Sequence, residues 1–262
     1  MATDTALKLA LAPLLAAQGL AVRRRALVLP EAAGPREGVA GNVGGFAPLR
    51  LLIVGDSSAA GVGAATQDEA LSGQLLRALA PHRPIVWRLI ARTGDTTARA
   101  LARLEAAPAA RFDIAITALG VNDVTHGVPL RRFLAGQAAL RRVLHGRFGV
   151  AHVLISGLPP MHAFPLLPQP LRGVLGITAR RFDRALAASV AGRDDATHLP
   201  FNLPLTPELM AADGFHPGPK GYAIWAGLLA EEVLRRAPAP QGRAARDFPT
   251  TCRENAANTR QG

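Results

Sequence analysis

Short apolar runs alternate with amphipathic segments over residues 49–236. The apolar runs, typical of strands buried on both faces of a parallel sheet, are Leu49–Val54, Ile85–Ala91, Phe112–Leu119, Val150–Ser156 and the weaker Thr197–Phe201. The segments with apolar residues at helical spacing are 67–80, Thr96–Leu104, Leu130–Leu144, 172–190 and Gly218–Arg235. Alternating strands and helices predict right-handed crossovers and a parallel sheet covered on both faces. We therefore expect a single three-layer α/β/α domain with about five strands.

The segments on either side of residues 49–236 have different patterns. Residues 30–48 are rich in Gly and Pro, which predicts an irregular loop, so residues 1–48 are expected to be a helix and a lead-in loop. Residues 237–262 are rich in Pro, Arg, Asn and Gln and predict a disordered tail. The single cysteine, Cys252, lies in that tail, which excludes an internal disulfide and a Cys-rich zinc site.

The N-terminal apolar segment Ala6–Val22 is interrupted by Lys8, Pro13 and a Gln-Gly pair. Its seventeen residues are at the short limit for a membrane span. A secretory signal carries its positive charges before the apolar run, whereas here Arg23–Arg25 follow it. We expect a helix that packs on the domain or makes a peripheral membrane contact through residues 6–22, in a cytoplasmic protein.

The net charge of +11 does not by itself indicate a nucleic-acid-binding protein. Of the 30 Lys and Arg residues only Lys8 and Lys220 are lysine, and the arginines are scattered in pairs over predicted helices. A nucleic-acid-binding surface combines a focused basic stripe with stacking aromatics. Aromatic residues make up 5% of the chain, with Tyr222 the only tyrosine, so we expect no nucleic-acid partner.

Four segments carry residues suited to catalysis. Functional residues of open α/β sheets gather at the carboxyl ends of the strands. Three of the segments follow predicted strands and the fourth precedes the last helix: Gly55-Asp56-Ser57-Ser58, Arg92-Thr93-Gly94-Asp95, Gly120-Val121-Asn122-Asp123 and Asp213-Gly214-Phe215-His216.

Ser57 is the candidate nucleophile, but a serine is inert without an adjacent base. His216 is the candidate base, and Asp213 is close enough in sequence to orient its imidazole and stabilise the imidazolium. Each could have a plainer role, because Gly-Asp-Ser also forms ordinary turns and His216 could be a surface residue. Among the other histidines, His126 is a candidate for the rim of the pocket.

Acyl transfer also needs hydrogen-bond donors for the developing oxyanion. Gly94 can present its backbone N–H without a side chain in the way, and Asn122 can point its amide into the same crevice. Taken singly, Gly94 could be a strand-end glycine and Asn122 an Asx-turn residue. Four successive segments that fit one reaction favour the catalytic interpretation.

Together these segments resemble the four blocks of the SGNH (GDSL-like) hydrolases, in the same order, over residues 49–236. The resemblance implies a flavodoxin-like sheet and ester hydrolysis through an acyl-enzyme. It also implies a catalytic set of Ser57, Asp213 and His216, and an oxyanion hole formed by Ser57, Gly94 and Asn122. One departure is Ser58, where many relatives have Leu; it leaves the chemistry untouched and the subfamily and substrate open. The chain has no His-Glu-x-x-His pattern, and no cofactor or metal is expected.

The expected function is a serine carboxylic-ester hydrolase that acts on a small-molecule acyl ester, with a short acyl chain or an aryl group. A carbohydrate deacetylase, a thioesterase or an acyltransferase would use the same residues. The alternative from another class is a catalytically silent α/β binding module. Such a module would have one of the four blocks degraded, and all four are intact here.

Overall fold

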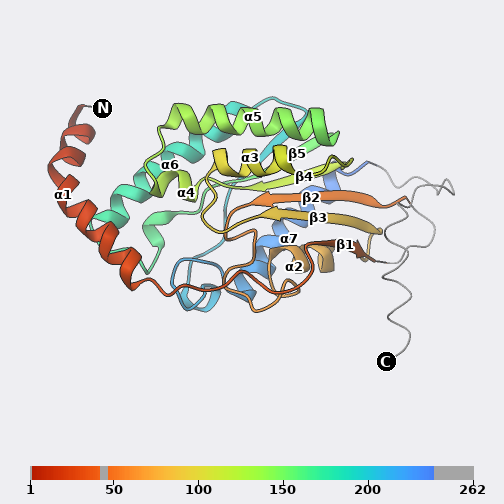
Figure 1. Ribbon diagram of the computed structural model, residues 1–262, viewed down its shortest axis with the longest axis horizontal. Coiled ribbons are helices and arrows are strands. Elements are labelled where there is room, and N and C mark those ends of the chain that lie inside the picture. Colours follow the sequence, from red (N-terminus) through yellow and green to blue (C-terminus); the bar gives the residue numbers. More distant parts are fainter. Residues whose placement is uncertain (1, 42–46, 239–262) are drawn as a thin grey trace.

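The computed structural model describes residues 2–41 and 47–238, and in these residues a six-stranded sheet lies between two layers of helices (Figure 1). The strands are β1 (Glu37–Ala40), β2 (Leu49–Gly55), β3 (Ile85–Ala91), β4 (Ile114–Ala118), β5 (His152–Ser156) and β6 (Ala196–Leu199). Their order is β1-β3-β2-β4-β5-β6, and all pairs are parallel except β1 with β3. Without β1, this is the flavodoxin-like order, so the predicted three-layer α/β/α fold is confirmed.

The helices are divided between the two faces of the sheet. They are α1 (Ala2–Arg25), α2 (Leu71–Leu79), α3 (Thr97–Ala106), the short α4 (Val121–Thr125), α5 (Leu130–Phe148), α6 (Leu171–Val190) and α7 (Pro219–Arg236). Helices α2 and α7 cover one face, and α3, α5 and α6 cover the other (Figure 1). Strand β2 alternates between the two cores, with Leu51 and Ile53 facing the first layer and Leu52 and Val54 facing the second.

Strand β1 is the main departure from the predicted elements. Residues 30–48 are expected to be irregular, yet Glu37–Ala40 pair antiparallel with β3 at the edge of the sheet. This expectation is wrong for these four residues because an edge strand needs no apolar run: its side chains are exposed or half-buried. A salt bridge of 2.7 Å between Glu37 and Arg88 fastens the pair. The predicted tail from residue 239 onward, with Cys252, lies outside the described residues.

Helix α2 begins at Leu71, four residues later than the apolar pattern indicates. The reason is Gln67, whose side chain is buried and hydrogen-bonded to other segments, so the helix does not begin there. Its Nε2 donates to the carbonyls of Ala32 and Ala60, both at 3.1 Å, and its Oε1 accepts from Ser72 at 2.6 Å. Gln67 therefore ties the N-terminal lead-in to the loop that follows Ser57.

Helix α1 extends along the side of the molecule and contacts α6 (Figure 1). The Gln18 side chain joins the two: its Nε2 donates to the carbonyl of Gln169 at 2.6 Å, and its Oε1 accepts from the N–H of Leu171 at 3.1 Å. Among the described residues, no helix is both long enough and apolar enough to cross a membrane. Peripheral membrane contact through residues 6–22 stays a prediction.

Candidate active site

The four predicted segments meet at one edge of the sheet because the parallel strands end there. Strand β2 lies between β3 and β4, so the loop that carries Ser57 is flanked by the loops that carry Gly94 and Asn122. The segment with Asp213 and His216 reaches the same edge from the loop before α7.

Ser57, His216 and Asp213 form a continuous hydrogen-bonded chain. The Nε2 atom of His216 lies 2.7 Å from the Oγ of Ser57, and its Nδ1 lies 2.6 Å from the Oδ2 of Asp213. Ser57 and Asp213 are both buried, with 7% of each residue exposed. An Nδ1–H that donates to the carboxylate leaves Nε2 as an acceptor for the Ser57 hydroxyl proton.

Asp213 has an environment that keeps it charged. Burial opposes its ionisation, but hydrogen bonds from the His216 side chain and from backbone N–H groups outweigh this and lower its pKa. The backbone donors are the N–H of Phe215 at 2.9 Å and the N–H of His216 at 3.0 Å, both to Oδ1. One carboxylate oxygen thus holds the loop, and the other faces the imidazole.

The serine loop and the histidine loop pack directly on each other. Gly63, with φ of +100°, has no room for a side chain, because a Cβ there would overlap the carbonyl oxygen of Pro217. The hydroxyl of Tyr222, on α7, donates to the carbonyl of Val62 at 2.6 Å. These contacts fix the distance between Ser57 and His216, which are 159 residues apart in sequence.

The predicted oxyanion donors belong to the serine loop and to the two loops that flank it. Within the described part of the chain, the N–H groups of Ser57 and Gly94 donate no hydrogen bond, so neither is already committed to a protein acceptor. The Nδ2 of Asn122 donates to the carbonyl of Asp95 at 3.1 Å and lies 3.3 Å from the Oδ2 of Asp56. Asn122 is therefore in contact with the residue beside Ser57 and with the residue beside Gly94.

The turn around Gly94 is held from two sides. The Oε1 of Glu31 accepts from the N–H of Thr93 at 2.6 Å, and Asp95 pairs with Arg103 on α3 at 2.8 Å. Glu31 belongs to the N-terminal lead-in, so residues before the sheet help to position this turn. Thr96 is the N-cap residue of α3, and the carboxylate of Asp95 just before it binds Arg103.

Asp56 holds the serine loop and the Asn122 loop together. Its carboxylate is buried and accepts from the N–H of Ser58 at 3.1 Å while it contacts Asn122. Burial raises the pKa of Asp56 to about 6, against the hydrogen bond from Ser58 and the charge of His216, which lower it. The only sequence signal for this role is its place immediately before the serine.

Asp123 holds the third loop in a similar way. It accepts from both the N–H and the hydroxyl of Thr97, each at 2.9 Å, and burial raises its pKa. The loop that carries Asn122 is therefore fastened to the start of α3.

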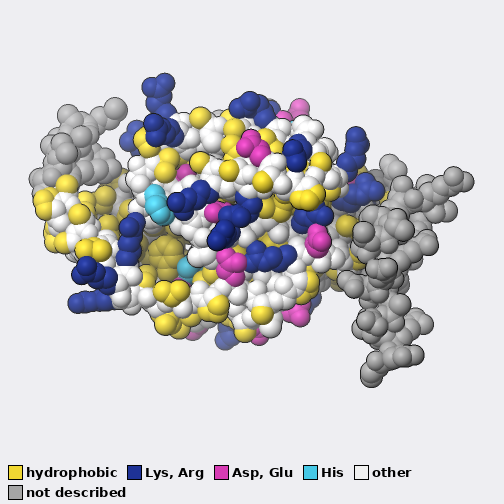
Figure 2. All heavy atoms as spheres, in the orientation of Figure 1, with side chains coloured by type: hydrophobic (Ala, Val, Ile, Leu, Met, Phe, Trp, Pro, Cys, Tyr) yellow, Lys and Arg dark blue, Asp and Glu magenta, His cyan; other side chains and the backbone are white. Residues whose placement is uncertain are grey.

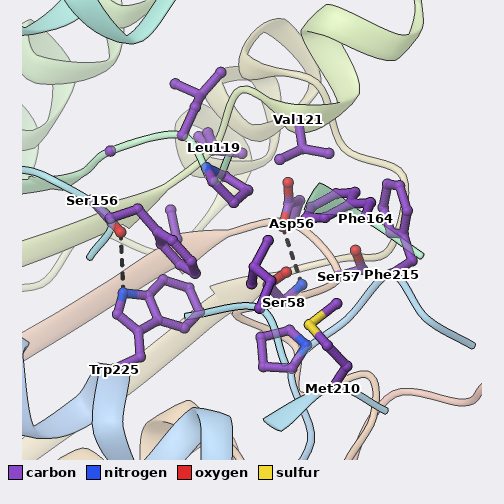
Figure 3. A pocket seen from close by; sticks show the side chains of 17 residues that line it. Asp56, Ser57, Ser58, Leu119, Val121, Ser156, Phe164, Met210, Phe215 and Trp225 are labelled. Atoms are coloured by element: carbon purple, nitrogen blue, oxygen red, sulfur yellow. Dashed lines mark hydrogen bonds between the residues drawn. The ribbon is translucent and has the colours of Figure 1, made fainter. Parts of the chain in front are cut away.

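A small apolar cavity opens beside Ser57 (Figure 3). Its volume is about 40 Å³, whereas about 10–15 Å³ admits one water. The residues labelled in Figure 3 show its lining: Leu119, Val121, Phe164, Met210, Phe215 and Trp225, together with Ser58 and Ser156. Trp225 donates to Ser156 at 3.1 Å, so the polar group of this aromatic side chain has a partner.

A larger groove lies on the histidine side of the site. Its volume is about 570 Å³, and His216, Asn122 and His126 line it together with residues of α1. His126, expected at the rim of the pocket, is one of the residues that line this groove. The Nδ1 of His126 lies 2.7 Å from the carbonyl oxygen of Asn122.

Comparison with known proteins gives one family. The model of the GDSL-like lipase/acylhydrolase family matches residues 53–224. A GDSL-like esterase of Mycobacterium tuberculosis is 29% identical over 195 residues, which cover 69% of this chain and 60% of that protein. The chain therefore spans about 60% of the length of the curated relative that it matches.

Solved structures share the fold. The psychrotrophic esterase EstA from Pseudoalteromonas sp. is similar with a TM-score of 0.55 and 19% identity, over 71% of this chain and 97% of its own. TesA has a TM-score of 0.54 and 24% identity with the same coverage. The lipase/acylhydrolase from Enterococcus faecalis has a TM-score of 0.52 and 19% identity, over 75% of this chain and all of its own.

Proposed function

This chain belongs to the GDSL-like lipase/acylhydrolase family, and we propose that it is a serine carboxylic-ester hydrolase for esters with short acyl or aryl groups. The observation that carries this proposal is the hydrogen-bonded chain from Ser57 through His216 to Asp213. A serine with a base at 2.7 Å, itself oriented by a carboxylate, is the arrangement that activates a hydroxyl for attack on an acyl carbon.

The first half of the reaction forms an acyl-enzyme. The Nε2 of His216 takes the proton of the Ser57 hydroxyl as Oγ bonds to the carbonyl carbon of the ester. The bond from that carbon to the alcohol oxygen then breaks, and His216 returns the proton to the departing oxygen. Asp213 stays ionised and stabilises the imidazolium formed in between, in keeping with its lowered pKa.

The second half repeats these steps with water. His216 takes a proton from a water molecule, whose oxygen bonds to the acyl carbon. The bond to Ser57 Oγ breaks, the serine recovers its proton from His216, and a carboxylic acid leaves. Both halves pass through a tetrahedral oxyanion, for which the N–H groups of Ser57 and Gly94 and the Asn122 amide are the proposed donors.

Replacing Asn122 with alanine is expected to lower kcat by about 10²–10³-fold, because one preorganised oxyanion donor is lost. The measurement is kcat on p-nitrophenyl acetate, with a thermal melt to establish that the variant is folded. Asp56→Asn is a useful companion, since it alters the contact with Asn122 while it leaves that amide in place. An unchanged kcat in folded Asn122→Ala would mean that Asn122 is only a turn residue.

The size of the cavity beside Ser57 supports the proposal that the acyl group is short. Its 40 Å³ corresponds to roughly three waters, which suits an acyl group of a few carbons. A longer chain would have to displace buried residues such as Trp225 and Leu119, and forcing extra methylenes into a packed interior costs about 1–3 kcal/mol.

A panel of p-nitrophenyl esters from acetate to decanoate tests the function and the chain-length preference together. Because the cavity is small, we expect kcat/KM to be highest for acetate to butyrate and to fall at least about tenfold by octanoate. Ser58→Leu should move the maximum toward acetate, since the leucine would occupy part of the cavity. Protein with Ser57→Ala gives the background rate. No hydrolysis above background would favour a binding module, and a maximum at octanoate or beyond would contradict the short-acyl assignment.

A further inference from the structure

The groove beside His216 is separate from the small cavity beside Ser57. One side of the groove is formed by α1, and the other by the start of α6 and the segment before it. Figure 2 shows hydrophobic side chains in the hollow between α1 and the rest of the molecule. The apolar residues that line it include Leu15, Leu20, Leu167, Leu171, Leu175 and Phe215.

Helix α1 is attached so that it forms a stable wall. Gln18 makes two hydrogen bonds to the start of α6, at 2.6 and 3.1 Å. Leu15 and Val22 pack against the core of the domain, while Leu20 lines the groove with 50% of its surface exposed. About half of the Leu20 surface is therefore open to contact with a molecule bound in the groove.

The chemistry of His216 determines which part of an ester can reach this groove. The imidazole must lie within hydrogen-bonding distance of the alcohol oxygen when it donates the proton to it. His216 and Asn122 line the groove but not the cavity, whereas Ser57 lines the cavity but not the groove. An ester bound across the two sites therefore has its acyl chain in the cavity and its alcohol chain along His216.

We propose that the groove between α1 and α6 binds the alcohol part of the ester, that this alcohol is an uncharged apolar chain or ring, and that α1 selects for it. The assignment rests on the proposed esterase function and names its substrate class: a short acyl group on a larger apolar alcohol. Most of the lining is aliphatic or aromatic, and its charged groups are Arg23 and Asp213, the latter already bonded to His216.

Helix α1 precedes the residues matched by the family, which begin at residue 53. The wall of the groove is thus supplied by a segment outside the matched catalytic region. Changes in α1 should alter the preference for the alcohol without touching the residues that carry out the reaction.

Two isomeric esters separate the two sites. Hexyl acetate and ethyl hexanoate have the same atoms, but the first has the long chain on the alcohol and the second has it on the acyl group. With ethyl acetate as the common reference, we expect each added alcohol methylene that enters the groove to raise kcat/KM about two- to fourfold. Lengthening the acyl chain to hexanoate should give no such gain.

Leu20→Glu tests the wall, and Leu14→Glu is the matched control. Both leucines lie on α1 with similar exposure, 50% and 46%, but only Leu20 lines the groove. We expect Leu20→Glu to lower kcat/KM for hexyl acetate about tenfold more than for ethyl hexanoate, because a charge replaces the apolar contact. Leu14→Glu should keep the parent profile on all three esters.

The outcomes are distinct. If the loss in Leu20→Glu falls on ethyl hexanoate, the groove binds the acyl chain and the assignment is overturned. It is also overturned if Leu14→Glu and Leu20→Glu behave alike, or if the parent chain shows no gain from longer alcohols while it still hydrolyses ethyl acetate. Absence of hydrolysis of every ester would instead overturn the proposed function, and the alcohol site with it.

Discussion

Replacing Ser57 with alanine is expected to lower kcat on p-nitrophenyl acetate by about 10⁶-fold. This is the size of the loss when the nucleophilic serine of a Ser-His-Asp triad is removed. The physical reason is that the acyl-enzyme cannot form without the Oγ that lies 2.7 Å from His216. Steady-state kinetics would measure the loss, with protein expressed free of host esterases because trace contamination limits the observable range.

The neighbouring hydroxyl provides an internal control for this prediction. Ser58 follows Ser57 directly and also lines the cavity, but only Ser57 is hydrogen-bonded to His216. A fluorophosphonate should therefore modify Ser57, and peptide mass spectrometry should find the adduct there. An adduct on Ser58, or a Ser57→Ala protein with near-parent activity, would refute the assignment of the nucleophile.

The second large effect is expected for Asp213→Asn, with kcat lowered about 10⁴-fold. Oδ1 of Asp213 accepts two backbone N–H groups, so the asparagine carbonyl should take that position. Its NH₂ group then faces Nδ1 of His216, which must become an acceptor. The proton moves to Nε2, where it faces Ser57, and the imidazole can no longer accept the serine proton.

Asp183 offers a matched control for that substitution. It is also hydrogen-bonded to a histidine, with its Oδ1 2.8 Å from the Nε2 of His198, but that pair does not contact Ser57. Asp183→Asn should keep kcat close to the parent value, and thermal melts should be measured for both variants. Equal losses in the two variants would indicate that Asp213 acts through folding rather than through the tautomer of His216.

Much of the fold follows from local sequence patterns. The strand Ile85–Ala91 is predicted with its observed bounds, because a buried run with clear ends carries its own signal. Strand β1 is missed because an edge strand has exposed or half-buried side chains and no apolar run. The start of α2 is misplaced because Gln67 is committed to carbonyls of Ala32 and Ala60, the first 35 residues away.

The candidate site also has residues that the sequence identifies, whereas other contacts of the chain are visible only in the structure. Ser57, Gly94 and Asn122 can be identified from the sequence because each follows a strand and parallel strands end at one edge. His216 and Asp213 are only three residues apart, so their pairing is also a local signal. In contrast, His198 has Asp195 three residues before it, the same spacing as in the Asp213–His216 pair, yet Asp195 binds Arg193 and His198 binds Asp183 instead. That contact arises from the packing of β6 against α6.

The sequence by itself thus determined the α/β/α fold, the edge of the sheet at which the site lies and the residues suited to ester hydrolysis, because periodicity and motif spacing are properties of short segments. Only the tertiary structure decided that Asp56 links Ser58 to Asn122 and that α1 forms a wall of the groove beside His216. These features depend on contacts between residues far apart in sequence, such as Gln18 with Leu171. Contacts of this kind form only when the packed layers bring the segments together, and they leave no pattern in either segment alone.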